Sequence, residues 1–144
     1  MNQLPHLYSV SVAASPEGSL RAFADHLPEI KVNAPVQFDG PGDQWSPEEL
    51  LMAAAANCFV LSFRTVAGIA KLDWVSIECS SSGELDKVER SMVFTKMTNK
   101  VRLVVADPVS KSKAETLLRK AEAICIVSNS LSADKFLELE VLSK

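Results

Sequence analysis

The sequence predicts an α+β fold, mainly because of the order of the expected elements. Three strand patterns come first, a long apolar helix follows, and two strands, an amphipathic helix and a final strand complete the chain. A doubly wound parallel sheet would require a regular alternation of strands and helices, which this order lacks. The chain has 144 residues, of which 47% are hydrophobic. This length is typical of one domain with a sizeable core, so we expect a single domain over residues 1–144.

The first third of the chain predicts three short strands. Within His6–Val12, apolar residues alternate with serines, which is the period of a half-buried strand. The segment Ser15–Ser19 contains proline and glycine and predicts a turn, after which Leu20–Ala24 completes a hairpin. A third strand is expected at Glu29–Val32. The Gly- and Pro-containing stretch Asp39–Asp43 then ends regular structure.

A long helix is expected next, and its start is the clearest local signal. Ser46 can cap the helix, Pro47 suits the first helical position, and Glu49 completes a capping box. From Pro47 to about Leu72 the chain is apolar on nearly all sides, with no charge between Glu49 and Arg64. Such a helix is typical of the centre of a protein. Polar residues interrupt the run before the ~20 apolar residues of a membrane span, so no membrane contact is expected.

The C-terminal half predicts strands on both sides of a second helix. Residues alternate with the strand period over Val75–Ser80, and Ser81–Gly83 predicts a turn after them. A further strand is expected over Met92–Val105. In Lys111–Ile124 leucines and alanines are spaced for one face and basic residues for the other, which indicates an amphipathic helix. Phe136–Leu142 is the last expected strand.

Charge balance and the N-terminal residues argue against several classes of protein. The chain carries 15 basic and 18 acidic residues, a formal net charge of -3, and no block of Lys or Arg. A nucleic-acid binder normally shows such a block, so no nucleic-acid partner is expected. The N-terminus has neither the basic region nor the unbroken apolar region of a secretory signal. We therefore expect a cytoplasmic protein.

The chain has three cysteines, Cys58, Cys79 and Cys125, which lie 21 and 46 residues apart. They form neither a C-x-x-C redox motif nor a zinc-ligand spacing, so a metal site with His6 or His26 is not expected. An odd number of cysteines in a domain with a large core indicates that any disulfide is transient. Buried cysteines are most often small apolar residues, which is our interpretation of Cys79. Cys125 is expected at a helix end, in a position more exposed than a helix interior.

Two segments resemble one known family. Ser46–Phe59 contains Pro-Glu-Glu-Leu, a run of small residues and a cysteine on one helix, and Ala121–Leu131 contains a cysteine shortly before Val-Ser and a later leucine. This pair of motifs, in this order, is similar to the OsmC/Ohr family of osmotically induced protein C-like and organic hydroperoxide resistance-like proteins. Ile126 stands where many members have proline. The resemblance implies an intertwined homodimer with antiparallel sheets around two central helices.

The same resemblance implies a thiol-dependent peroxidase that reduces organic hydroperoxides or hydrogen peroxide. Cys58 would attack the peroxide and become a sulfenic acid, and Cys125 would resolve it by forming a disulfide. Neither a cofactor nor a metal is implied. A lipoyl-bearing or thioredoxin-like dithiol would then reduce the disulfide. Cys79 should lie remote from both reactive thiols.

Glu48 matches the family's active-site carboxylate, which works with an arginine to orient the reactive cysteine. On one straight helix, the ten residues between Glu48 and Cys58 span about 15 Å, so a shared site would take Glu48 from the other subunit. At the two places where family members carry the arginine, this chain has Gln37 and Glu17-Gly18. Arg21 is close to the second place and is the candidate.

One alternative belongs to a different class of protein. A non-catalytic dimeric module of the same fold would bind a hydrophobic small molecule or sense redox state through its thiols. The paired cysteines favour the peroxidase, whereas the missing arginine motif favours the binding module. Rapid loss of two thiols per chain after one equivalent of hydroperoxide would distinguish them.

Overall fold

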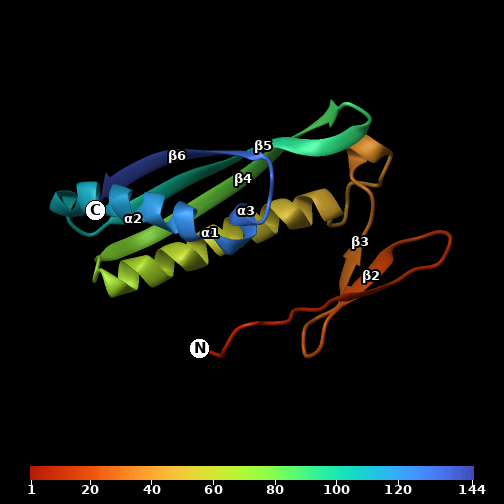
Figure 1. The fold of residues 1–144 in the computed structure, drawn as a ribbon, viewed down its shortest axis with the longest axis horizontal. Helices are drawn as coiled ribbons and strands as arrows, with labels where there is room; N and C mark the ends of the chain where they lie inside the picture. Colours follow the sequence, from red (N-terminus) through yellow and green to blue (C-terminus); the bar gives the residue numbers. More distant parts are fainter. The chain divides into compact units, whose positions relative to one another are not determined.

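The computed structural model describes all 144 residues and confirms the predicted α+β class (Figure 1). Three strands come first, then a long helix, two strands, further helices and a final strand. The chain divides into two compact units, Met1–Leu50 and Leu51–Lys144, with the boundary in the first turn of the long helix. The single domain expected over residues 1–144 stays a prediction.

The N-terminal unit contains a small antiparallel sheet. Strand β1 spans Ser11–Ala13, β2 spans Leu20–Phe23 and β3 spans Ile30–Val32, in the order β1-β2-β3. The second and third strands agree with the prediction to within one residue. The first is shorter than the predicted His6–Val12, because only its three residues pair with β2. The large apolar side chains that precede it stay exposed.

The loop between β3 and the long helix is closed on itself. The backbone N–H of Asn33 donates to the carbonyl oxygen of Trp45 at 2.9 Å, and the 3-10 helix η1, Val36–Phe38, lies between them in the chain. Gly40 is required here, since a Cβ atom would lie 1.7 Å from the carbonyl oxygen of Ala34. The closed loop therefore fixes where the long helix begins.

Helix α1, Pro47–Ile69, begins where the capping motif predicts. The backbone N–H of Glu49 donates to Ser46 Oγ at 3.1 Å, which satisfies one of the free N–H groups of the first turn. The helix ends at Ile69 and not at the predicted Leu72, because Lys71 takes a positive φ of 54° that no helix continues.

The second unit is built on a mixed sheet. Strands β4, Trp74–Val88, and β5, Ser91–Val105, form an antiparallel hairpin, and β6, Asp134–Ser143, lies beside β5. Because β5 and β6 run parallel, the predicted antiparallel arrangement is wrong for this pair, although it holds for the others. The cause is the connection: residues 106–133 contain helices that carry the chain back beside β5 before β6 starts.

Strand β4 continues through the turn that was predicted at Ser81–Gly83. A Cβ atom on Gly83 would lie 2.8 Å from Cε of Met52 and 2.9 Å from a ring atom of Phe94. The glycine is therefore needed for a close approach of side chains to the sheet, and not for a turn. The hairpin turns later, where Glu89 has a positive φ of 56°.

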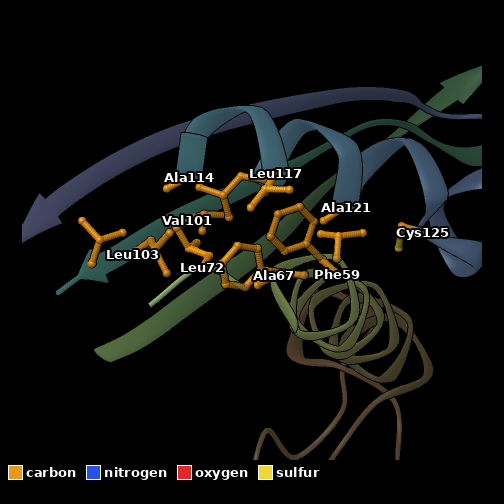
Figure 2. Packing of buried hydrophobic residues seen from close by; sticks show 13 residues of the cluster. Phe59, Ala67, Leu72, Val101, Leu103, Ala114, Leu117, Ala121 and Cys125 are labelled. Carbon is orange, nitrogen blue, oxygen red and sulfur yellow. The ribbon is translucent and has the colours of Figure 1, made fainter. Parts of the chain in front are cut away.

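Two helices follow β5: α2, Lys111–Ile124, and α3, Ile126–Asn129. The bounds of α2 agree with the prediction, whereas α3 was not predicted. Figure 2 shows that α1, α2 and β5 contribute side chains to one apolar core, at whose edge Cys125 lies. The completely buried large side chains of this core are Phe59, Phe63, Leu103, Leu118 and Val105.

Only one face of α1 is buried within the chain. Its buried residues recur at the spacing of helical turns: Ala55, Phe59, Phe63, Val66 and Ala67. Leu61 and Ile69 are 58% and 78% exposed. The elements of a single chain are therefore too few to cover every apolar side of the helix. By length and hydropathy alone α1 could also cross a membrane, a criterion that core helices of soluble proteins meet as well.

Candidate functional site

The structure brings Cys58 and Cys125 together in the second unit. Cys58 lies near the middle of α1 and is partly buried, and Cys125 is the single residue between α2 and α3. The two thiols lie close enough for each to shift the pKa of the other, and both cysteines are free thiols. The residues that the two family motifs singled out are therefore neighbours in space.

Cys125 lies at a helix end, as predicted, but it is fully buried. Its backbone is extended, with φ -65° and ψ 108°, which ends α2 and starts α3. The side chain has 0% exposed surface, so the expectation of a more exposed position is wrong. The cause is that the chain turns directly into α3 while the cysteine points into the core of α1, α2 and β5.

Hydrogen-bond donors stabilise a thiolate at Cys58. Burial raises the pKa of this thiol, whereas the backbone N–H of Val127, the Cys125 thiol, the backbone N–H of Ile126 and the Ser62 hydroxyl lower it. The donors together outweigh burial, and the pKa of Cys58 lies below its ordinary value. Because the thiolate is the nucleophilic form, Cys58 is the more reactive member of the pair.

Cys125 is held as a neutral thiol. Burial raises its pKa, the hydroxyl and backbone N–H of Ser128 lower it, and the neighbouring Cys58 raises it. The net result is a pKa above the ordinary value. Cys125 therefore keeps its proton when Cys58 loses one, and this proton can be donated to the Cys58 sulfur. The arrangement is an unequal dithiol, with one nucleophile and one donor.

Cys79 is the third cysteine and lies on β4, opposite Val101 of β5. Its packing against the core agrees with the interpretation as a small apolar residue. Burial raises the pKa of Cys79, the Ser81 hydroxyl lowers it, and a charge on Cys125 raises it. The prediction that Cys79 lies remote from both reactive thiols stays a prediction.

Glu48 lies in the first turn of α1, within the N-terminal unit. Its Oε2 atom is buried and has no hydrogen-bond partner, an arrangement that costs free energy unless a partner is supplied. The carboxylate lines a cavity of about 270 Å³ together with Leu20, Val32, Asn33, Ala34, Pro35, Phe38 and Pro47. Its assignment to the Cys58 site stays a prediction.

Arg21 on β2 takes part in a surface ion pair. Its Nη1 atom lies 3.1 Å from Oε1 of Glu29, and its side chain is 58% exposed. The groups that shift the pKa of Cys58 come from α1 and residues 125–127, and no guanidinium is among them. The activation of Cys58 by Arg21 stays a prediction.

The donors around the two sulfurs were not predicted from the sequence. Ser62 follows Cys58 by four residues, a spacing that places side chains on adjacent turns of a helix. This spacing could have identified it. Ser128 follows Cys125 by three residues, but its contact depends on α3, for which the sequence shows no separate signal. The backbone donors of α3 were missed for the same reason.

We expect Ser62→Ala to raise the pKa of Cys58, because alanine removes one of the donors that lower it. Fewer thiolates are then present at neutral pH, so the rate of alkylation by iodoacetamide should fall several-fold. The measurement is the alkylation rate of Cys58 against pH. Thr65→Val is the matched control, since the Thr65 hydroxyl donates to the carbonyl oxygen of Leu61 at 3.1 Å. Identical pH profiles for the two variants would remove Ser62 from the site.

Fold and site together define an α+β protein with two neighbouring thiols of unequal pKa. The chain matches the family model of OsmC-like proteins over residues 40–140, and it belongs to this family. Peroxiredoxin OsmC of Escherichia coli is 33% identical over 98 residues, which are 68% of each chain. The uncharacterised protein YmaD of Bacillus subtilis is 25% identical over 116 residues, 78% of this chain and 77% of that one. The predicted family is therefore confirmed.

Solved structures share the fold over almost the whole chain. An OsmC-like protein of unknown function from Vibrio cholerae has a TM-score of 0.86 and 18% identity, covering 94% of this chain and 100% of that one. An organic hydroperoxide resistance protein OsmC from Legionella pneumophila has a TM-score of 0.75 and 23% identity, covering 96% and 99%. The chain therefore has the OsmC-like fold.

Proposed function

We propose that the protein is a thiol-dependent peroxidase that reduces organic hydroperoxides or hydrogen peroxide. The observation that carries the proposal is the proximity of Cys58, whose pKa is lowered, to Cys125, whose pKa is raised. A nucleophilic thiolate beside a second, protonated thiol is the arrangement that peroxide reduction through a disulfide requires. Membership of the OsmC-like family supports a role of this kind.

In the first step, the Cys58 thiolate attacks the distal oxygen of the peroxide. A sulfur–oxygen bond forms while the oxygen–oxygen bond breaks, and Cys58 becomes a sulfenic acid. The leaving oxygen takes up a proton and departs as an alcohol, or as water when the substrate is hydrogen peroxide. The donors that lower the pKa of Cys58 increase the fraction of the nucleophilic thiolate.

In the second step, Cys125 condenses with the sulfenic acid. A Cys58–Cys125 disulfide forms, the sulfur–oxygen bond breaks, and the hydroxyl group leaves as water with the proton of Cys125. The hydroxyl and N–H of Ser128 stabilise the Cys125 sulfur while it loses that proton. A lipoyl-bearing or thioredoxin-like dithiol then reduces the disulfide.

The proposal includes a homodimer in the cytoplasm. The exposed apolar face of α1, with Leu61 and Ile69, supports a second copy as its cover. In this dimer Glu48 of the partner subunit, whose Oε2 is unpartnered in a single chain, and Arg21 orient the Cys58 thiolate. Sedimentation at micromolar protein concentration should give twice the 15.6 kDa mass of the chain, and a monomer would contradict the dimer.

A thiol count before and after peroxide tests the peroxidase. The reduced chain has three free thiols, and one equivalent of cumene hydroperoxide should rapidly leave one, because both Cys58 and Cys125 enter the disulfide. The count is made with a thiol reagent in denaturant after an acid quench. An unchanged count would contradict the proposed activity.

A non-catalytic binding or redox-sensing module is the second candidate. The cavity beside the unpartnered Glu48 oxygen favours it, because a small molecule with a hydrogen-bond donor would satisfy that oxygen. The thiol count separates the binding module from the peroxidase, because a binding module keeps all its thiols on the time scale of that measurement.

A further inference from the structure

The two sulfurs of the proposed site differ in their access from outside the chain. Cys125 has 0% exposed surface and lies at the edge of the core of α1, α2 and β5, where atoms of its own chain cover it. Cys58 is only partly buried. A partner subunit can cover either residue further, but it cannot uncover Cys125, which its own chain buries. Cys58 is therefore the sulfur that an external thiol can approach without opening the core.

We propose that the reducing dithiol attacks the Cys58 sulfur of the Cys58–Cys125 disulfide, so that the mixed disulfide of the cycle forms on Cys58. This inference rests on the proposed function, because it concerns the disulfide that peroxide reduction leaves behind. In thiol–disulfide exchange the attacking sulfur approaches opposite the leaving one, and access decides which sulfur is attacked. Because Cys125 has 0% exposed surface, an approach to its sulfur would have to displace atoms of its own chain.

The exchange proceeds in two balanced steps. A thiolate of the dithiol bonds to the Cys58 sulfur, the Cys58–Cys125 bond breaks, and Cys125 leaves as a thiolate that takes up a proton. The second thiol of the reductant, once deprotonated, then attacks its partner sulfur in the mixed disulfide, and Cys58 leaves as a thiolate. Two electrons pass from the dithiol to the protein disulfide, and the reductant departs as a disulfide.

The relative quality of the two leaving groups favours attack on Cys125 and not on Cys58. A thiol of lower pKa leaves faster, and the donors around Cys58 would make it the better leaving group if Cys125 were attacked. This preference changes the rate only for a sulfur that can be reached, whereas complete burial prevents the approach itself. The hydroxyl and N–H of Ser128 also offset the disadvantage, because they stabilise the departing Cys125 thiolate.

The position of Cys125 also explains why a dithiol is needed. In the mixed disulfide, Cys125 stays beside Cys58 and can attack it again, which expels the reductant and restores the protein disulfide. The second thiol of a dithiol competes with this reversal within the same complex. A monothiol has no such competitor, so it reduces the protein only when it is in large excess.

Mapping of the mixed disulfide tests the inference. A Cys79→Ser protein, which retains only Cys58 and Cys125, is oxidised in separate arms by cumene hydroperoxide and by diamide, and loss of two hydrogens confirms the disulfide. Brief treatment with excess 2-mercaptoethanol, an acid quench, alkylation of free thiols and peptide mass spectrometry then locate the adduct. We expect the adduct on Cys58 and the alkyl group on Cys125. An adduct mainly on Cys125 would overturn the inference.

Two further measurements distinguish a failure of the proposed peroxidase activity from a failure of the inference about which sulfur is attacked. Should hydroperoxide leave the thiols intact while diamide oxidises them, the peroxidase is wrong, but the diamide arm still locates the adduct. In the same background, Cys58→Ser and Cys125→Ser each retain one thiol of the pair. The remaining Cys125 should react with an aromatic disulfide reagent at least tenfold more slowly than the remaining Cys58, and denaturant should remove the difference. Equal rates in the folded proteins would also overturn the inference.

Discussion

Cys58→Ser should abolish peroxide consumption by the protein. A serine hydroxyl is a far weaker nucleophile than a thiolate at neutral pH, and the burial-raised pKa values of Cys79 and Cys125 keep the remaining thiols protonated. The measurement is the loss of hydroperoxide in a single turnover, with protein and peroxide at equal concentration. Equal rates for the wild-type protein and the variant would contradict the mechanism.

Cys125→Ser should behave differently from Cys58→Ser in the same assay. Its first turnover should survive, although more slowly, because attack needs the Cys58 thiolate but the Cys125 thiol is one of the donors that stabilise it. The sulfenic acid then has no partner, and excess peroxide should oxidise it to the sulfinic form. Intact mass after excess oxidant should show two added oxygens, while the Cys79→Ser control should form its disulfide as the wild type does. An unchanged mass would remove Cys125 from the cycle.

Phe63→Ala should lower the free energy of unfolding by about 3–5 kcal/mol, the usual cost of emptying a buried aromatic site. Phe63 has 0% exposed surface, and its ring meets that of Trp74 edge to face at a centroid distance of 5.4 Å. It joins α1, which carries Cys58, to β4 of the sheet. The measurement is urea unfolding at one fixed protein concentration, since a dimer makes stability depend on concentration.

Phe136→Ala is the matched control for this stability measurement. The same atoms are removed, but Phe136 on β6 is 49% exposed, so the loss should stay below about 1 kcal/mol. A similar loss for both variants would contradict the assignment of Phe63 to the core that holds the site.

Local signals in the chain were sufficient for most of the elements. The capping residue Ser46 and the apolar pattern of Lys111–Ile124 are both local, and the helices that they predict begin where expected. The prediction of a turn at Ser81–Gly83 was wrong because glycine occurs both in turns and where side chains approach the backbone closely. At Gly83 the approaching side chain is Met52, which lies far away in the sequence. The direction of β6 depends on how the preceding helices pack, which no strand pattern records.

The candidate site was predicted only in part. The two motifs identified Cys58 and Cys125, because each motif lies within one continuous segment. Their unequal pKa values could not be predicted, since these depend on burial and on donors from α3 and Ser62 that meet only after folding. The burial of Cys125 likewise depends on the core around it.

The sequence alone was sufficient to predict the α+β class, the start of α1, the extent of α2 and the two cysteines of the motifs. Each of these depends on residues that are close neighbours along the chain. Folding alone decided the parallel pairing of β6, the packing role of Gly83 and the difference between the two thiols. The physical reason is that the pKa and the accessibility of a sulfur depend on the atoms around it in space. For Cys58 and Cys125 these atoms come from segments that lie far apart in the sequence.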